Sequence, residues 1–254
     1  MNSVVFGRSL SIRNSEVQKL LVILVLLTLN TPLNAQKQEF KHYSGWNTLS
    51  VKGELNEEWS LKSEFNFRRT HFLKDWEQIV LRPSVQYSLN GVLSTAIGYS
   101  FIHNYPYAEF SAPLSTREDN IWQQLYLKQS FDHFDLNHRL RLEERFRDVV
   151  NTVGSPTIKG TEYSNRLRYR MTVSIPMFLV QGLNIVAYDE VFLDLEKGIQ
   201  PKGLDQNWLF LGIRFPESEH ISITSGYHKI YIPLGNNGSV SNHIWETNLT
   251  YTFK

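Results

Sequence analysis

The sequence contains no cysteine among its 254 residues. Disulfide frameworks and thiolate metal sites are therefore excluded. Beyond the N-terminal region there is no apolar run of the about 20 residues that a membrane helix needs. Helical periodicity is almost absent as well. The formal net charge is only +1, which argues against bulk nucleic-acid binding because that binding needs a concentrated basic surface.

The N-terminus has the features of a secretory signal peptide, which we assign to residues 1–35. Three positive charges come first, at Arg8, Arg13 and Lys19. The apolar run Leu20–Leu29 follows, and Ala35 supplies a small residue before the cut. This run is about half the length of a spanning helix, so a membrane anchor is the less favoured alternative. Cleavage removes three cations and one anion, Glu16, which changes the formal charge from +1 to −1 and leaves residues 36–254 as one domain.

Alternation of apolar and polar residues dominates the remaining chain. In Trp59–Arg68, for example, Trp59, Leu61, Phe65 and Phe67 alternate with polar residues. Because successive side chains of a strand point to opposite faces, this segment has one apolar and one polar face. The same pattern recurs in Gln78–Tyr87, Leu93–Phe101, Arg139–Arg147, Arg166–Ile175 and Leu209–Phe215. The sequence predicts an all-β, antiparallel protein.

A transmembrane up-and-down β-barrel explains this pattern better than a soluble β protein does. Many of the segments span about ten residues or more, which suits a tilted membrane crossing. Connections alternate between short and long ones, as in outer-membrane barrels. The expected long connections are Thr70–Asp75, Asn104–Glu118, Asp148–Glu162, Asp194–Gly203 and Ile232–Ser241. Aromatic residues expected near strand ends, as in a membrane-interface girdle, are Trp59, Trp76, Tyr105, Trp122, Tyr231 and Trp245.

The number of strands is predicted as about 10–12. Ten strands fit between Trp59 and Phe253, and Gly45–Leu55 adds another. Bacterial single-chain barrels have even strand numbers, so a short further strand at Gln38–Ser44 would give twelve. The last segment places Trp245, Leu249, Tyr251 and Phe253 on one face, although Lys254 follows the final aromatic residue. Such a terminal strand resembles the signal that the bacterial barrel-assembly machinery recognises.

The polar faces supply the candidate functional residues, which we expect to line the barrel interior. They are Lys62, Glu64, Arg68, Arg82, Arg139, Arg141, Glu143, Arg145, Arg147, Arg166, Arg168, Arg170 and Glu190. An unpaired charge in a confined interior is costly, so Glu64, Glu143 and Glu190 are expected counterions. The first interpretation is a salt-bridged plug that stiffens the barrel. The alternatives are an electropositive channel for small anionic solutes and a site for an acidic lipid headgroup.

Catalytic and metal sites find little support. No Gly-x-Ser-x-Gly elbow occurs. His138 and Glu144 interrupt the apolar face of their strand, but they are too far apart on it to form part of a triad. His103 and His228 are expected at the rim, and the other histidines lack metal-ligand spacing. An outer-membrane lipase or acyltransferase and a soluble periplasmic lipid-binding protein remain alternatives, and no cofactor is expected.

Three segments resemble an uncharacterised bacterial family catalogued as domain of unknown function 2490. They are Arg139–Phe146, Asn120–Leu125 and Asp205–Trp208. The third departs from the expected pattern, because Trp208 stands where we expect arginine. The resemblance implies an outer-membrane barrel of a Gram-negative bacterium, but no activity, ligand or catalytic residue. The expected partners are outer-membrane lipid, the barrel-assembly machinery and small anionic solutes, with no nucleic acid.

Overall fold

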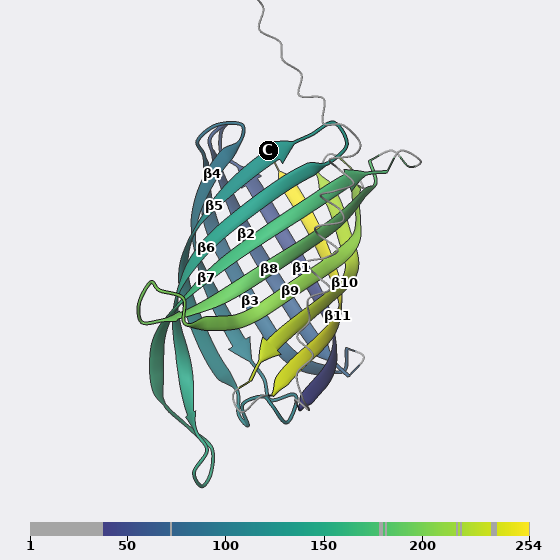
Figure 1. Cartoon of the computed structure of the whole chain (residues 1–254). Helices are drawn as coiled ribbons and strands as arrows, with labels where there is room; N and C mark the ends of the chain where they lie inside the picture. Colours follow the sequence, from purple (N-terminus) through teal and green to yellow (C-terminus); the bar gives the residue numbers. More distant parts are fainter. Residues whose placement is uncertain are drawn as a thin grey trace, which may run out of the picture. The chain divides into compact units, whose positions relative to one another are not determined.

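A computed structural model describes residues 38–71, 73–177, 180, 182–216, 218, 220–234 and 238–253. The predicted signal peptide lies outside these residues. Figure 1 shows a closed barrel in which neighbouring strands follow one another around the wall. Within the described residues, no helix is long and apolar enough to span a membrane. The prediction of an all-β barrel is confirmed.

Eleven strands form the barrel wall. They are β1 (Glu39–Glu54), β2 (Trp59–Thr70), β3 (Asp75–Ser88), β4 (Leu93–Asn104), β5 (Thr116–Ser130), β6 (Asp135–Asn151), β7 (Thr157–Pro176), β8 (Asn184–Glu196), β9 (Gly203–Pro216), β10 (Ile221–Pro233) and β11 (Ser239–Phe253).

The barrel closes through a parallel pair. Strands that follow one another in the chain pair antiparallel, whereas β1 pairs with β11 in parallel, from Glu39 opposite Ser239 to Gly53 opposite Phe253. Because direction alternates along the chain, the first and last of eleven strands must run the same way. The even count favoured from the sequence is corrected, since Glu39–Ser44 is the first part of β1 rather than a strand of its own.

The alternation separates an apolar outer face from a polar interior. Outward residues of the predicted apolar faces are exposed, with Leu61 at 45% and Leu211 at 59%. Their polar neighbours are buried, as with Arg141 at 3%. The expected girdle residue Trp122 is wrong, because it is 2% exposed and belongs to the inward face of β5. Trp59 is exposed and begins β2, as a position in a girdle requires, whereas Trp245 is exposed but lies near the middle of β11 rather than at a strand end.

Asparagine side chains stabilise two of the short turns. Asn56 accepts hydrogen bonds from the backbone amides of Glu58 and Trp59, at 2.9 and 2.8 Å. Asn90 does the same for Val92 and Leu93. These side chains replace the missing backbone partners of a tight turn, which is why asparagine is favoured there.

Loop lengths differ from the expected alternation. We call the end with connections 71–74, 105–115, 152–156, 197–202 and 234–238 the long-loop end, and the opposite end the short-turn end. Only the eleven residues between Asn104 and Thr116 form a long irregular loop. Much of Asp148–Glu162 is strand instead, because β6 and β7 continue as a hairpin to Asn151 opposite Thr157. Figure 1 shows this hairpin projecting beyond the barrel body.

Candidate functional site: a charged network inside the barrel

The centre of the candidate site is a row of opposed arginines on β6 and β7. Arg139 lies opposite Arg170, and Arg141 lies opposite Arg168. Like charges directly across a strand pair are destabilising. The opposed arginines are therefore stable only if inward carboxylates of these strands and their neighbours neutralise them.

Glu190 on β8 binds three of these arginines. Its two carboxylate oxygens accept hydrogen bonds from Arg139 Nη2 at 2.5 Å, Arg168 Nε at 2.8 Å and Arg170 Nε at 2.7 Å. The Glu190 side chain is completely buried. One carboxylate thus joins strands β6, β7 and β8 in charge-assisted hydrogen bonds, which are the stronger kind.

Glu143 makes the second junction. It accepts hydrogen bonds from Arg166 Nε and Arg168 Nη1, both at 2.7 Å, and lies 3.7 Å from Arg141 Nη1. Arg168 therefore bridges Glu143 and Glu190. Since the Glu143 side chain is only 1% exposed, this network lies in the buried part of the interior.

Two further carboxylates of the network were not predicted from the sequence. Glu118 on β5 accepts hydrogen bonds from Arg145 Nε at 2.8 Å and Nη2 at 3.0 Å. Asp205 on β9 accepts one from Arg166 Nη1 at 3.0 Å. The alternation of β5 could have indicated Glu118, because it shares the inward face of Trp122. Asp205 is the residue skipped at the register shift between β8 and β9, so alternation could not have placed it.

A smaller group of charges occupies β2 and β3. Lys62 Nζ lies 2.7 Å from Glu64, and Arg82 Nη1 lies 3.1 Å from the same carboxylate. Arg82 Nε also donates to Ser100 on β4 at 3.0 Å. These predicted interior residues therefore share one carboxylate, as Arg139, Arg168 and Arg170 do.

The last two predicted arginines lie apart from these groups. Arg68 is stacked on Trp46, 3.6 Å from the ring centroid, and donates to Gln78 at 2.5 Å. Arg147 lies towards the long-loop end, with its Nη2 3.7 Å from Glu162, and both side chains are more than one third exposed. Arg147 thus belongs to the rim, where solvent weakens an ion pair.

An aromatic cluster surrounds His228 in the interior. The rings of Trp46, Trp208 and Tyr188 lie 5.1 to 5.7 Å from the imidazole, and Glu246 lies 2.6 Å from His228 Nδ1. The expected rim position of His228 is wrong, because its side chain is completely buried. Trp208, which stands where the family pattern suggested arginine, packs in this cluster.

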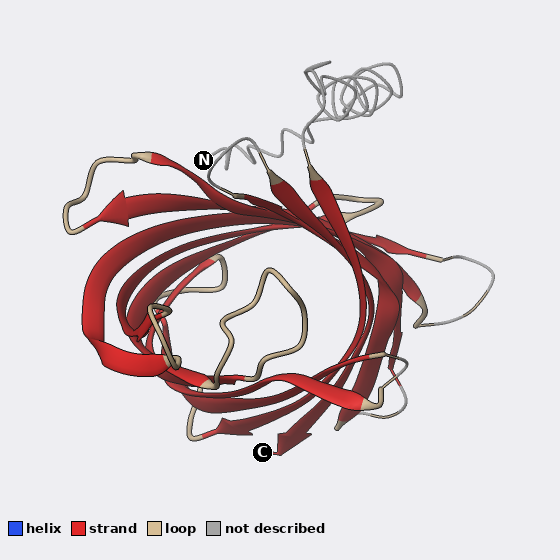
Figure 2. Cartoon of the chain, turned by 90° about the horizontal axis from the view of Figure 1, so that it is seen from below, coloured by secondary structure: helices blue, strands red, loops and turns tan. Residues whose placement is uncertain are grey.

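The loop between β4 and β5 reaches β1 at the long-loop end. The Tyr107 ring lies 4.9 Å from that of His42, and the Phe110 ring lies 5.8 Å from that of Phe40. Burial raises the pKa of the Tyr107 phenol above its usual value, and the negative charge of Glu77 acts in the same direction. Figure 2, which views the barrel along its axis, shows loop segments lying across the opening.

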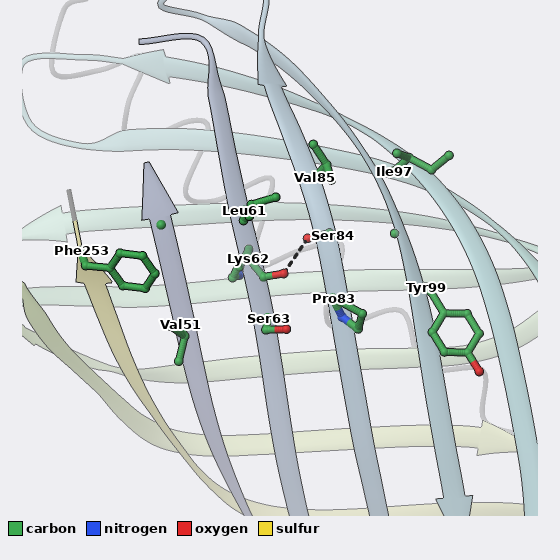
Figure 3. A pocket seen from close by; sticks show the side chains of 12 residues that line it. Val51, Leu61, Lys62, Ser63, Pro83, Ser84, Val85, Ile97, Tyr99 and Phe253 are labelled. Atoms are coloured by element: carbon green, nitrogen blue, oxygen red, sulfur yellow. Dashed lines mark hydrogen bonds between the residues drawn. The ribbon is translucent and has the colours of Figure 1, made fainter. Parts of the chain in front are cut away.

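On the outer face, the hydrogen-bond partners of His138 are neutral side chains. His138 Nδ1 lies 2.7 Å from the hydroxyl of Tyr169, and its Nε2 lies 3.2 Å from Gln129. A shallow outer groove of about 480 Å³ lies near the short-turn end, between Phe253 and Tyr99. Figure 3 shows aliphatic and aromatic side chains along it, and its lining contains neither histidine nor carboxylate.

Within the described ranges, no group of three or more histidine, aspartate or glutamate side chains could hold a metal ion. The carboxylates that converge in the interior bind arginine instead.

Comparison with known proteins identifies the family. The family model of proteins of unknown function called DUF2490 matches residues 43–241. The chain belongs to this family. The match covers all of the interior network, from Lys62 to Asp205, and the aromatic cluster up to His228.

Among solved structures, the chain is similar to the NanC porin in a rhombohedral crystal form. The two share 11% sequence identity, with a TM-score of 0.44, over 78% of this chain and 89% of that one. No curated protein matches the sequence.

Proposed function

We propose that this DUF2490 member is a passive outer-membrane barrel whose interior is held closed by its arginine–carboxylate network. The observation that carries the proposal is the division of each strand into an exposed apolar face and a buried charged face. Strands of 12 to 20 residues are long enough to cross the hydrocarbon core when tilted. A soluble barrel would expose its apolar outer face to water at a large cost.

The packing at the centre supports a closed interior. Arg141, Glu143, Arg168 and Glu190 are each at most 3% exposed. Their hydrogen bonds join the four neighbouring strands β5 to β8, so moving Glu143, Arg168 or Glu190 breaks several charge-assisted contacts. The network then acts as a plug that stiffens the wall rather than as the lining of an open channel.

A narrow pore for small anionic solutes is the second candidate. Among the described residues of the interior there are nine cationic side chains and seven carboxylates. The cations are Lys62, Arg68, Arg82, Arg139, Arg141, Arg145, Arg166, Arg168 and Arg170. The carboxylates are Glu64, Glu77, Glu118, Glu143, Glu190, Asp205 and Glu246. The excess of positive charge favours anions over cations in any path that opens.

Planar-bilayer recording separates these two candidates. We expect the purified wild-type barrel to conduct little, because the network fills the centre. Glu143→Gln leaves Arg166 and Arg168 short of a carboxylate and should give a larger, anion-selective conductance. Glu162→Gln, at the exposed rim, is the matched control and should behave as the wild type. A wide wild-type conductance would overturn the plug, and cation preference would overturn the anion pore.

Cell fractionation tests the proposed location. We expect the chain to be exported with loss of residues 1–35, inserted by the barrel-assembly machinery and extracted only with detergent. It should also migrate faster on gels before heating than after, as a folded barrel does. Recovery in the soluble periplasmic fraction without detergent would overturn the membrane assignment.

A further inference from the structure

Two lysines stand on the outer face beside the parallel closure, near the long-loop end. Lys41 on β1 and Lys229 on β10 are both exposed and both belong to outward positions. Strand β11 lies between them, with Ser241 opposite Lys41 and His243 opposite Lys229. Two strand spacings and a two-residue offset place their Cα atoms about 12 Å apart.

Aromatic side chains and a histidine form the surface between these lysines. The ring of Tyr43 is stacked on that of His243, with centroids 5.3 Å apart. The hydroxyl of Tyr227 lies 2.5 Å from His243 Nδ1. The imidazole therefore contacts the side chains of both tyrosines.

Neither lysine is ion-paired within the part of the chain that the structure describes. Among the described residues, no carboxylate oxygen lies within 4 Å of either ammonium group. Two outward carboxylates occur nearby. Asp189 lies two strands from Lys229 and accepts a hydrogen bond from Asn207 at 2.6 Å, and Glu39 is the exposed residue at the very start of β1. The surface between Lys41 and Lys229 thus carries two ammonium groups outside any described ion pair, with Glu39 two residues from Lys41 on the same face.

The position of the lysines in a bilayer limits what can neutralise them. A lysine on the lipid face is costly at the midplane of the bilayer, and the cost nearly disappears at the interface. Lys229 is four residues from the end of β10 at Pro233, and Lys41 is two residues from the start of β1. Their flexible stems let both ammonium groups extend towards the headgroup layer, where phosphates are the available anions.

We propose that Lys41, Lys229 and His243 form a binding site for a phosphate-bearing lipid headgroup on the outer face of the barrel. The ammonium groups bind phosphate oxygens as point charges, while Tyr43 and Tyr227 support the headgroup from below. This inference rests on the proposed membrane location and adds a specific lipid contact to it. The site is separate from the interior network.

Native mass spectrometry of the whole detergent-purified barrel tests the site. The probes are diphosphoryl lipid A, monophosphoryl lipid A and phosphatidylcholine, with inorganic phosphate as a separate arm. We expect the diphosphoryl form to be retained most strongly. The double variant Lys41→Gln/Lys229→Gln should bind it about 30-fold more weakly, since each basic residue near an anionic lipid surface contributes about 1 kcal/mol.

A charge-matched control distinguishes the site from general attraction. Lys128 near the short-turn end and Lys159 on the projecting hairpin are exposed lysines on other parts of the barrel. The double variant Lys128→Gln/Lys159→Gln should retain wild-type affinity. Equal losses in the two double variants would overturn the site. Inorganic phosphate binding as tightly as the lipid would overturn the lipid class.

Failure of this site and failure of the membrane assignment give different results. Heat-modifiable migration of both double variants shows that the barrel is folded before lipid binding is measured. A folded, detergent-dependent barrel that retains diphosphoryl lipid A no better than phosphatidylcholine would overturn this site alone. A chain that is soluble without detergent would overturn the proposed location as well.

Discussion

Arg168 donates from its Nε to Glu190 at 2.8 Å, although the strand register places Phe192 opposite Arg168. The contact is therefore diagonal, and it frees the other nitrogens of Arg168 to reach Glu143 on the opposite side. One guanidinium group thereby joins carboxylates from β6 and β8.

Replacing Glu190 by glutamine should destabilise the barrel strongly. The change removes the shared carboxylate of Arg139, Arg168 and Arg170, and leaving buried charges without a partner costs about 3–5 kcal/mol. Unfolding by denaturant in detergent micelles, followed by tryptophan fluorescence, measures the loss. Glu162→Gln breaks an exposed pair and should cost at most about 1 kcal/mol. Equal losses would contradict the central role of Glu190.

Adding a single methyl group at Gly98 should disturb the interior. A Cβ there would lie 2.2 Å from the ring of Trp122, which is stacked against Arg141 and donates to Ser100 at 3.0 Å. Overpacking of this kind costs about 1–3 kcal/mol. Gly91→Ala is the control, because nothing lies within 4 Å of a Cβ at that turn. Thermal unfolding of the two variants should differ, and identical midpoints would show that Trp122 moves freely.

Cysteine cross-linking should report the parallel closure directly. The natural chain has no cysteine, so an introduced pair is the sole thiol pair. Asn47 and Thr247 are register partners, and Asn47→Cys/Thr247→Cys should oxidise readily. Asn47→Cys/Tyr251→Cys is displaced by four residues, about 13 Å, which exceeds the about 7 Å limit for a disulfide. Gel mobility with and without reductant gives the answer. Preferential cross-linking of the displaced pair would refute the register.

Removing the last aromatic side chain should impair assembly more than stability. Phe253 lies on the predicted assembly-signal face with Tyr251, and its ring covers Gly53. We expect Phe253→Ala to reduce the amount of heat-modifiable barrel in outer-membrane fractions. Phe215→Ala, with a similarly exposed side chain at the end of β9, is the matched control. Equal reductions in the two variants would show that no special signal resides in the last strand.

The alternation of apolar and polar residues along each strand is what made the inward and outward positions predictable from the sequence. The outward positions of Leu61 and Leu211 and the inward position of Arg141 follow from the period-two geometry of a strand, which needs no knowledge of neighbours. Glu190 and Glu143 could be expected as counterions because an interior rich in arginine requires them. Trp122 and His228 were misplaced because large aromatic side chains occur on both faces of this barrel.

Sequence alone therefore determined the fold class, the two faces of each strand and the chemical character of the interior, because each depends on residues one and two positions apart. The tertiary structure decided the number of strands and the parallel closure between β1 and β11, which are properties of the whole ring. It also decided which carboxylate serves which arginine. Those contacts depend on register and bulges between strands, so the sequence could not predict the role of Asp205. The Lys41–Lys229 surface could not be predicted either, because it forms only where β1 and β11 pair.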